Sequence, residues 1–173
     1  MEQRQIHGDN QQQRFLDWFG GIIDGEGCIT FKCRWQRNRY IQINPVIIIT
    51  NTSKELIDEC IDGLNGIGIP YWMTVKHPKT KTKDGMSLQS VYHIEVSGLK
   101  RIARLIPYLK VRAKKDQVEL LRKFTESRLR LDGRVKTPYT TEELKWVEEL
   151  ARKHTRKNAQ RLYARLLQKH QGE

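Results

Sequence analysis

The chain has 173 residues, enough for one compact domain with a sizeable core, or for a core domain plus a small appendage. Hydrophobic residues make up 38% of it and charged residues 30%, and no apolar run approaches the roughly 20 residues that span a bilayer, so we expect a folded protein with no membrane association. The N-terminus lacks the apolar core of a secretory signal, which predicts an intracellular protein, cytoplasmic or organellar. Lysine and arginine total 32 against 20 acids, a net charge of +12, and nucleic acid is the anionic partner most typical of such a charge.

The three cysteines Cys28, Cys33 and Cys60 show no CxxC spacing. A disulfide framework and a structural zinc site are therefore not expected. Buried or reduced thiols in an intracellular protein are the ordinary explanation for such cysteines.

The first expected element is a helix over residues 12–23, after a polar and loosely held segment over residues 1–11. Its apolar residues recur at helical spacing, but Gly20 and Gly21 interrupt the pattern. Each glycine costs a helix about 1 kcal/mol relative to alanine. Two in succession predict the close approach of another backbone.

Two strands follow, over residues 28–36 and 40–51, with residues 37–39 as the turn. In both strands apolar residues alternate with polar ones, which predicts one buried face and one polar face. Pro45 predicts an edge position or a bulge for the second strand, because proline cannot donate to a sheet ladder.

The remaining elements follow from capping signals and periodicity. Thr52 and Glu55 match a capping box before a helix that Gly66 or Gly68 closes. The next elements are a strand pair over residues 71–77 and 90–96, which flanks a basic loop, and two amphipathic helices over 99–109 and 114–131. A turn-rich joint over 132–139 leads to two tail helices over 141–153 and 157–169, of which the first has a capping box at Thr140 and Glu143. This order favours an α+β fold with helices on one face of a four-stranded antiparallel sheet and a polar, basic opposite face.

Two acids, Asp24 and Glu26, directly follow the first helix, and each precedes a glycine. Negative charge at a helix C-terminus opposes the helix dipole, so this placement is locally unfavourable. Carboxylates beside a phosphate-binding surface also repel DNA unless a cation lies between them. Hard cations such as Mg²⁺ take oxygen ligands, which carboxylates supply.

Residues 19–27, FGGIIDGEG, resemble the LAGLIDADG motif of homing endonucleases: hydrophobic, small, Gly, two hydrophobic, Asp, small, acid, Gly. The expected element order is also similar to the αββαββα core of that family. The resemblance covers residues 12–131 as the endonuclease core. Residues 132–173 are similar, more loosely, to the helical C-terminal extension of single-motif members packed on that core.

The resemblance implies a divalent-metal site for Mg²⁺, or Mn²⁺ or Ca²⁺ in its place, and no small-molecule cofactor. Glu26 would be the metal ligand and the Gly25 carbonyl would lie at the same centre. Asp24 would shape the turn, with a secondary catalytic role. Asn51 would order solvent near the metal, and Lys100, with Arg101 as a rival, would be the basic residue near the scissile phosphate.

The chain holds one such motif, which supplies half an active site, so the family implies a homodimer. Motif helices of two subunits would pack at Gly20 and Gly21, aided by Trp18. A two-fold protein matches two half-sites, so the target would be a long, pseudo-palindromic stretch of double-stranded DNA. Each subunit would contribute to the hydrolysis of one phosphodiester bond on each strand.

The DNA-reading surface is expected on the polar sides of the strands, with lysines and arginines of the loops and tail on phosphate. The candidate DNA-binding residues are Thr30, Lys32, Arg34, Gln36, Arg37, Arg39, Gln42, Asn44, Ile48, Thr50, Thr74, Lys76, Lys79, Lys81, Lys83, His93, Arg156, Lys157 and Arg161.

An alternative function is an intron RNA maturase, or a DNA-binding regulator without catalysis, on the same fold. The retained acids at positions 24 and 26 favour the nuclease, because a pure binding protein has no need of carboxylates near phosphate.

Overall fold

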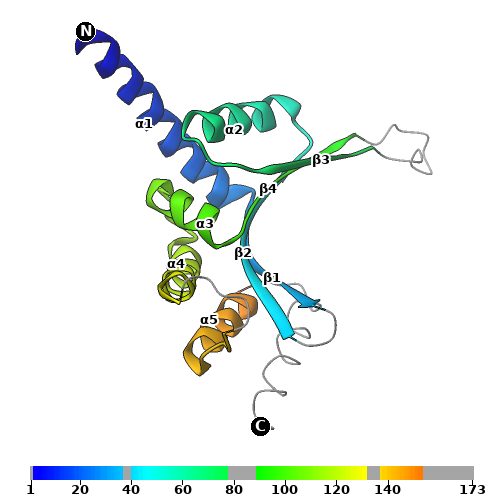
Figure 1. Ribbon diagram of the computed structural model, residues 1–173. Coiled ribbons are helices and arrows are strands. Elements are labelled where there is room, and N and C mark those ends of the chain that lie inside the picture. Colours follow the sequence, from blue (N-terminus) through cyan, green and yellow to red (C-terminus); the bar gives the residue numbers. More distant parts are fainter. Residues whose placement is uncertain (1, 37–39, 78–88, 132–136, 154–173) are drawn as a thin grey trace, which may run out of the picture. The chain divides into compact units, whose positions relative to one another are not determined.

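The computed structural model describes residues 2–36, 40–77, 89–131 and 137–153 of the chain. The elements follow in the order α1, β1, β2, α2, β3, β4, α3, a short 3₁₀ helix η1, α4 and α5 (Figure 1). Their bounds are α1 Glu2–Gly25, β1 Gly27–Gln36, β2 Tyr40–Asn51, α2 Lys54–Gly66, β3 Trp72–Lys76, β4 Val91–Ser97, α3 Leu99–Leu105, η1 Ile106–Tyr108, α4 Lys115–Arg130 and α5 Thr141–Arg152. Within these described residues, no helix is both long and apolar enough to cross a bilayer.

The four strands form one antiparallel sheet in the order β1-β2-β4-β3, so the expected α+β fold is confirmed. Each hairpin supplies one outer and one inner strand. In the second hairpin the register pairs Trp72 with Glu95 and Lys76 with Val91. The alternation that predicted the strands also appears in their burial: Ile29 and Phe31 of β1 are buried, while Arg34 is exposed.

Of the two positions expected for Pro45, the edge strand is wrong, because β2 is an inner strand, and the bulge stays a prediction. Two polar groups near the proline have partners outside β1 and β2. The amide of Gly98 donates to the Pro45 carbonyl at 3.1 Å, and the Ile43 amide donates to the Tyr139 hydroxyl at 2.8 Å. This stretch of β2 therefore satisfies its polar groups with a residue following β4 and with a distant side chain.

Three element boundaries differ from those expected. α1 begins at Glu2, so residues 2–11 are helical; glutamine and glutamate are good helix formers, and an apolar-periodicity criterion does not detect them. The N-cap of α2 is Ser53, not Thr52: its hydroxyl accepts from the Leu56 amide at 3.2 Å. The helix expected over residues 99–109 ends at Leu105 and continues as η1, since Pro107 has no amide hydrogen to extend the α-helix.

The chain divides into two compact units that interleave along the sequence. The first comprises Met1–Cys28, Ile47–Val96 and Tyr108–Ala113; the second comprises Ile29–Val46, Ser97–Pro107 and Lys114–Glu173. The division into a core of 12–131 and an extension of 132–173 stays a prediction.

In the first unit, α1 packs on α2 through a close contact between a ring and a glycine. A Cβ added to Gly63 would lie 1.8 Å from the Phe15 ring, so only glycine leaves room for that ring. Phe15 in turn stacks on Phe19, with ring centroids 5.1 Å apart. Phe19, Ile23 and Ile57 are nearly inaccessible to solvent and form part of this core.

In the second unit, a buried ion pair joins α4 to α5. Arg128 and Glu143 are 2% and 0% exposed, and the guanidinium lies 3.4 Å from the carboxylate. Arg128 also donates to the carbonyls of Thr137 and Pro138. Glu143 completes the predicted capping box with Thr140, which is confirmed, so one carboxylate both caps α5 and binds α4.

Arg128→Met should lower the free energy of unfolding by about 3 kcal/mol or more, because it leaves a buried carboxylate without its cation. Arg122→Met is the matched control on the same helix. Arg122 pairs with Glu119 and Glu126 in solvent, so its loss should leave stability nearly unchanged. Urea unfolding followed by circular dichroism measures both; equal effects would contradict the assignment.

Candidate functional site

The turn between α1 and β1 carries the expected metal ligand. Gly25 is the last residue of α1, and the exposed Glu26 follows it with its amide donating to the Ile22 carbonyl at 2.8 Å. Gly27, the first residue of β1, is buried, and a Cβ there would lie 2.6 Å from the Ile23 carbonyl oxygen. The motif's last glycine therefore allows the helix to pass directly into the strand, which leaves Glu26 at the bend.

The two acids of the motif have different surroundings. Asp24 is half-buried, and its carboxylate accepts a hydrogen bond of 2.6 Å from the backbone amide of Arg112, 88 residues away. Hydrogen bonds to an ionised acceptor are stronger than neutral ones. Asp24 therefore attaches the segment before α4 to the end of α1, whereas Glu26 faces solvent.

Two further contacts hold residues 108–113 along α1. The Lys110 ammonium lies 2.9 Å from the Asp17 carboxylate, and this pairing, chiefly its hydrogen bond, lowers the Asp17 pKa. A Cβ added to Gly20 would lie 2.4 Å from the Lys110 carbonyl oxygen. Gly20 thus admits a backbone of its own chain, and the close approach predicted from the double glycine exists within the molecule.

Arg112 is a candidate site residue that the sequence pattern does not predict. Its side chain is exposed, and its amide is fixed to Asp24. Nothing in the spacing of the sequence signals this neighbour, because basic residues occur throughout 100–115. Only the contacts of the segment with Asp17, Gly20 and Asp24 single out Arg112.

Asn51 lies in the same unit at the end of β2. Its side-chain oxygen accepts from the Ser53 amide at 2.8 Å, which bends the chain into α2. The residue is half-buried. The structure therefore assigns Asn51 a turn-forming contact, and its expected place beside a metal stays a prediction.

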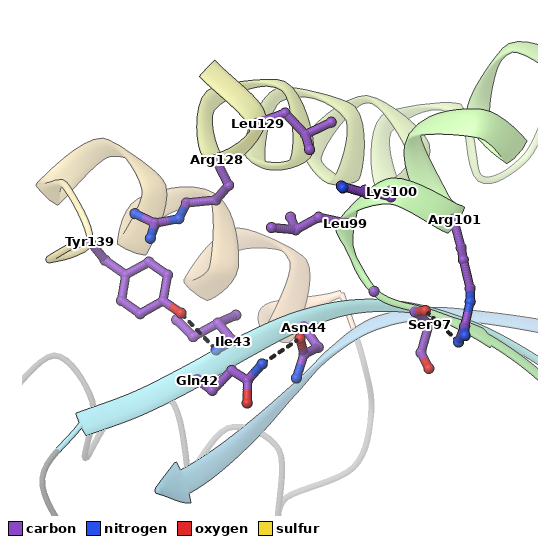
Figure 2. A pocket seen from close by; sticks show the side chains of 11 residues that line it. Gln42, Ile43, Asn44, Ser97, Leu99, Lys100, Arg101, Arg128, Leu129 and Tyr139 are labelled. Carbon is purple, nitrogen blue, oxygen red and sulfur yellow. Dashed lines mark hydrogen bonds between the residues drawn. The ribbon is translucent and has the colours of Figure 1, made fainter. Parts of the chain in front are cut away.

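Lys100 and Arg101 occupy the first turn of α3, in the second unit, and both are exposed. They line a pocket of about 540 Å³ together with Leu99, Leu129 and Tyr139 (Figure 2). Arg101 reaches back to the Ser97 carbonyl at 3.5 Å. Burial raises the pKa of the Tyr139 phenol, and the Tyr139 hydroxyl accepts a hydrogen bond from the Ile43 amide.

The expected DNA-reading side chains on the strands are partly accessible. In the first hairpin, Gln42 donates to Asn44 at 3.3 Å. Between the two inner strands, the Thr50 hydroxyl of β2 lies within hydrogen-bond distance of His93 of β4, 3.0 Å from its Nδ1. The exposed candidates are Arg34, Thr50, Thr74 and Lys76, and the half-buried ones are Thr30, Lys32, Gln42, Asn44, Ile48 and His93.

Several expected contacts fall outside the part of the chain that the structure describes. These residues are Arg37, Arg39, Lys79, Lys81, Lys83, Arg156, Lys157 and Arg161; for Gln36, only the backbone at the end of β1 is described.

One face of α1 is open. Trp18, Gly21 and Gly25 stand at positions i, i+3 and i+7, which share a helix face. Trp18 is half-buried and both glycines are exposed, with nothing within 4 Å of an added Cβ at either glycine. Within the described ranges, no three histidine, cysteine, aspartate or glutamate side chains gather closely enough to hold a metal ion.

Gly20→Ala should lower the free energy of unfolding by about 1–3 kcal/mol, because its Cβ would collide with the Lys110 backbone. Gly66→Ala is the control: Gly66 ends α2 with nothing within 4 Å, so a change within about 1 kcal/mol is expected. Denaturant unfolding compares the two, and a Gly20→Ala chain as stable as the parent would refute the contact.

No protein-family model and no curated protein sequence matches the chain. Solved structures do. The homing endonuclease I-TnaI aligns with a TM-score of 0.60 at 19% identity, over 89% of this chain and 96% of its own. The archaeal intron-encoded homing endonuclease I-Vdi141I, solved with DNA, aligns with a TM-score of 0.55 at 18% identity, over 87% of this chain and 94% of its own. The homing endonuclease I-CvuI, solved with its target in the presence of Ca, aligns with a TM-score of 0.52 at 17% identity, over 82% of this chain and 78% of its own.

These alignments span most of the chain, between 82% and 89% of it. The fold expected from residues 19–27 is therefore confirmed. The chain has the fold of the LAGLIDADG homing endonucleases.

Proposed function

We propose that the chain is a site-specific double-strand DNA endonuclease that acts with a divalent metal as a homodimer. The observation that carries the proposal is the end of α1, where an exposed carboxylate, Glu26, lies two residues from a carboxylate, Asp24, that is bonded to a basic segment. The solved structures of I-Vdi141I and I-CvuI, which contain DNA, support the choice of substrate.

The donors at this turn fit a hard cation. Glu26 offers a solvent-facing carboxylate, and Gly25 is the last residue of α1, where helix carbonyls lack partners within the helix. The C-terminal end of a helix carries partial negative charge, which also favours a cation. Oxygen donors of this kind suit Mg²⁺, which, when bound, would polarise a phosphate oxygen and lower the pKa of water.

The chain's own residues then have separate tasks. Glu26 holds the cation against the DNA backbone. Asp24 keeps the amide of Arg112 at the end of α1, and the exposed Arg112 side chain neutralises charge on the phosphate. We therefore assign the basic role expected for Lys100 to Arg112, since a hydrogen bond to Asp24 holds the Arg112 backbone amide beside the motif.

The open face of α1 is the proposed seam between two copies. Gly21 and Gly25 are four residues apart and carry no side chain, so a second helix can approach closely, with Trp18 covering the contact. Gly20 is not assigned to this seam, because the Lys110 backbone of the same chain packs against it. Two-fold pairing brings two Glu26 turns together on two strands of DNA, and it predicts a pseudo-palindromic target.

The polar strand faces are the proposed reading surface. A two-stranded ribbon fits the major groove, where arginine and lysine suit guanine and amides suit adenine. The net charge of +12 per chain predicts affinity that falls steeply with salt.

Glu26→Gln should reduce cleavage at least about 100-fold while leaving DNA affinity within a few-fold, because it removes the carboxylate that holds the cation and keeps the side-chain shape. Glu59→Gln, an exposed change on α2, is the control. Cleavage of a target recovered from a randomised duplex library is measured with Mg²⁺ and with a chelator. Cleavage by Glu26→Gln at the parent rate, or by the parent in chelator, would exclude the mechanism.

Arg112→Gln should slow cleavage roughly 100-fold with a small loss of affinity, since one of many cations is removed but it is the one beside the reacting phosphate. The backbone amide that binds Asp24 is retained, so folding should be unaffected. Lys100→Gln is the matched comparison. A larger loss of cleavage rate for Lys100→Gln than for Arg112→Gln would restore the basic role to Lys100.

A further inference from the structure

One face of the second hairpin carries an unusual pair of side chains. The register pairs Trp72 with Glu95, Thr74 with His93 and Lys76 with Val91, and alternate residues of a strand share a face. These six residues therefore lie on one face, which we call the β3–β4 face. The other face is the apolar one, since Ile94 and Val96 are buried.

Trp72 is 66% exposed, the most exposed large apolar side chain among the described residues. Single exposed apolar residues are common on protein surfaces and need no function by themselves. Trp72, however, sits on the face expected to meet DNA, directly opposite an acid. This pairing gives the position a second feature to explain.

Glu95 lies near His93 of the same strand, β4, and His93 in turn contacts the adjacent strand β2. Its carboxylate lies 3.7 Å from His93 Nε2, and His93 Nδ1 lies 3.0 Å from the Thr50 hydroxyl of β2. The Glu95 and His93 side chains are 16% and 27% exposed. The Glu95 carboxylate is therefore mostly covered and lies beside a histidine that is itself fixed to β2, which distinguishes it from a freely solvated surface acid.

An acid in this place is unfavourable beside phosphate, because the two negative charges repel. Base edges in the major groove offer it a different partner: cytosine presents the N4 amino donor, which glutamate accepts. The indole of Trp72 provides an apolar surface, and the thymine C5-methyl is the apolar group in the same groove. A fixed carboxylate next to an exposed indole therefore matches base edges better than it matches the sugar–phosphate backbone.

We propose that Glu95 and Trp72 determine target specificity: Glu95 accepts a hydrogen bond from a cytosine amino group, and Trp72 packs on the methyl group of a neighbouring thymine. This inference rests on the proposed function, because it requires double-stranded DNA on the β3–β4 face. It adds two specificity residues, neither of them basic, to the cationic and amide side chains of the strands.

Glu95→Gln tests the proposal by exchanging a cytosine acceptor for an amide, which suits adenine. Cleavage of a randomised duplex library with Mg²⁺, followed by sequencing, gives the preference at every position. We expect one position per half-site to shift from cytosine toward adenine by roughly 10-fold, with the other positions unchanged. Trp72→Ala should reduce the thymine preference at an adjoining position by a similar factor.

Glu59→Gln is the control and should reproduce the parent profile. Trp72→Ala keeps the test decisive if Glu95→Gln fails to fold, since Trp72 is largely outside the core. An unchanged profile for a folded, cleaving Glu95→Gln, or for Trp72→Ala alone if Glu95→Gln does not fold, overturns the inference and leaves the nuclease intact. A parent chain that neither binds nor cuts any duplex instead overturns the proposed function.

Discussion

The end of α1 is held by contacts with residues 108–113 of the same chain. Lys110 fits against Gly20 because that residue has no side chain, and the Arg112 amide is hydrogen bonded to Asp24. A backbone contact at Gly20 and a charge-assisted hydrogen bond at Asp24 fix segment 108–113 to the helix. The turn that follows contains Glu26, whose side chain is exposed.

This arrangement separates two neighbouring carboxylates that look equivalent in the sequence. The Asp24 carboxylate is held by a backbone amide, whereas Glu26 meets solvent at the bend. The same contrast recurs elsewhere in this basic chain. Glu143 is fully buried and serves Arg128 and Thr140, while Glu95 is held at the surface of the sheet beside His93. The partners of each carboxylate, and not its charge alone, therefore distinguish the acids that the fold holds from Glu26, which faces solvent.

The second unit shows how a sheet tolerates an irregular strand. Pro45 offers no amide, yet its carbonyl and the Ile43 amide are satisfied by Gly98 and Tyr139. Arg128 stacks on the Tyr139 ring at 4.6 Å and binds the carbonyls just before it. Arg128, through its buried ion pair with Glu143, thus stabilises the α4–α5 contact. It also holds Tyr139, whose hydroxyl accepts the hydrogen bond from Ile43 of β2.

Local pattern by itself determined the strands, the capping box at Thr140, the α+β class and the motif at residues 19–27, because periodicity and capping depend on neighbours in sequence. It misplaced the start of α1 and the cap at Ser53, where polar side chains, not apolar ones, set the boundary. Only the tertiary structure revealed the partner of Gly20, the bond from Arg112 to Asp24, and the Trp72–Glu95 pair. Those contacts join residues separated by more than twenty positions, and no local spacing records which distant segments fold against each other.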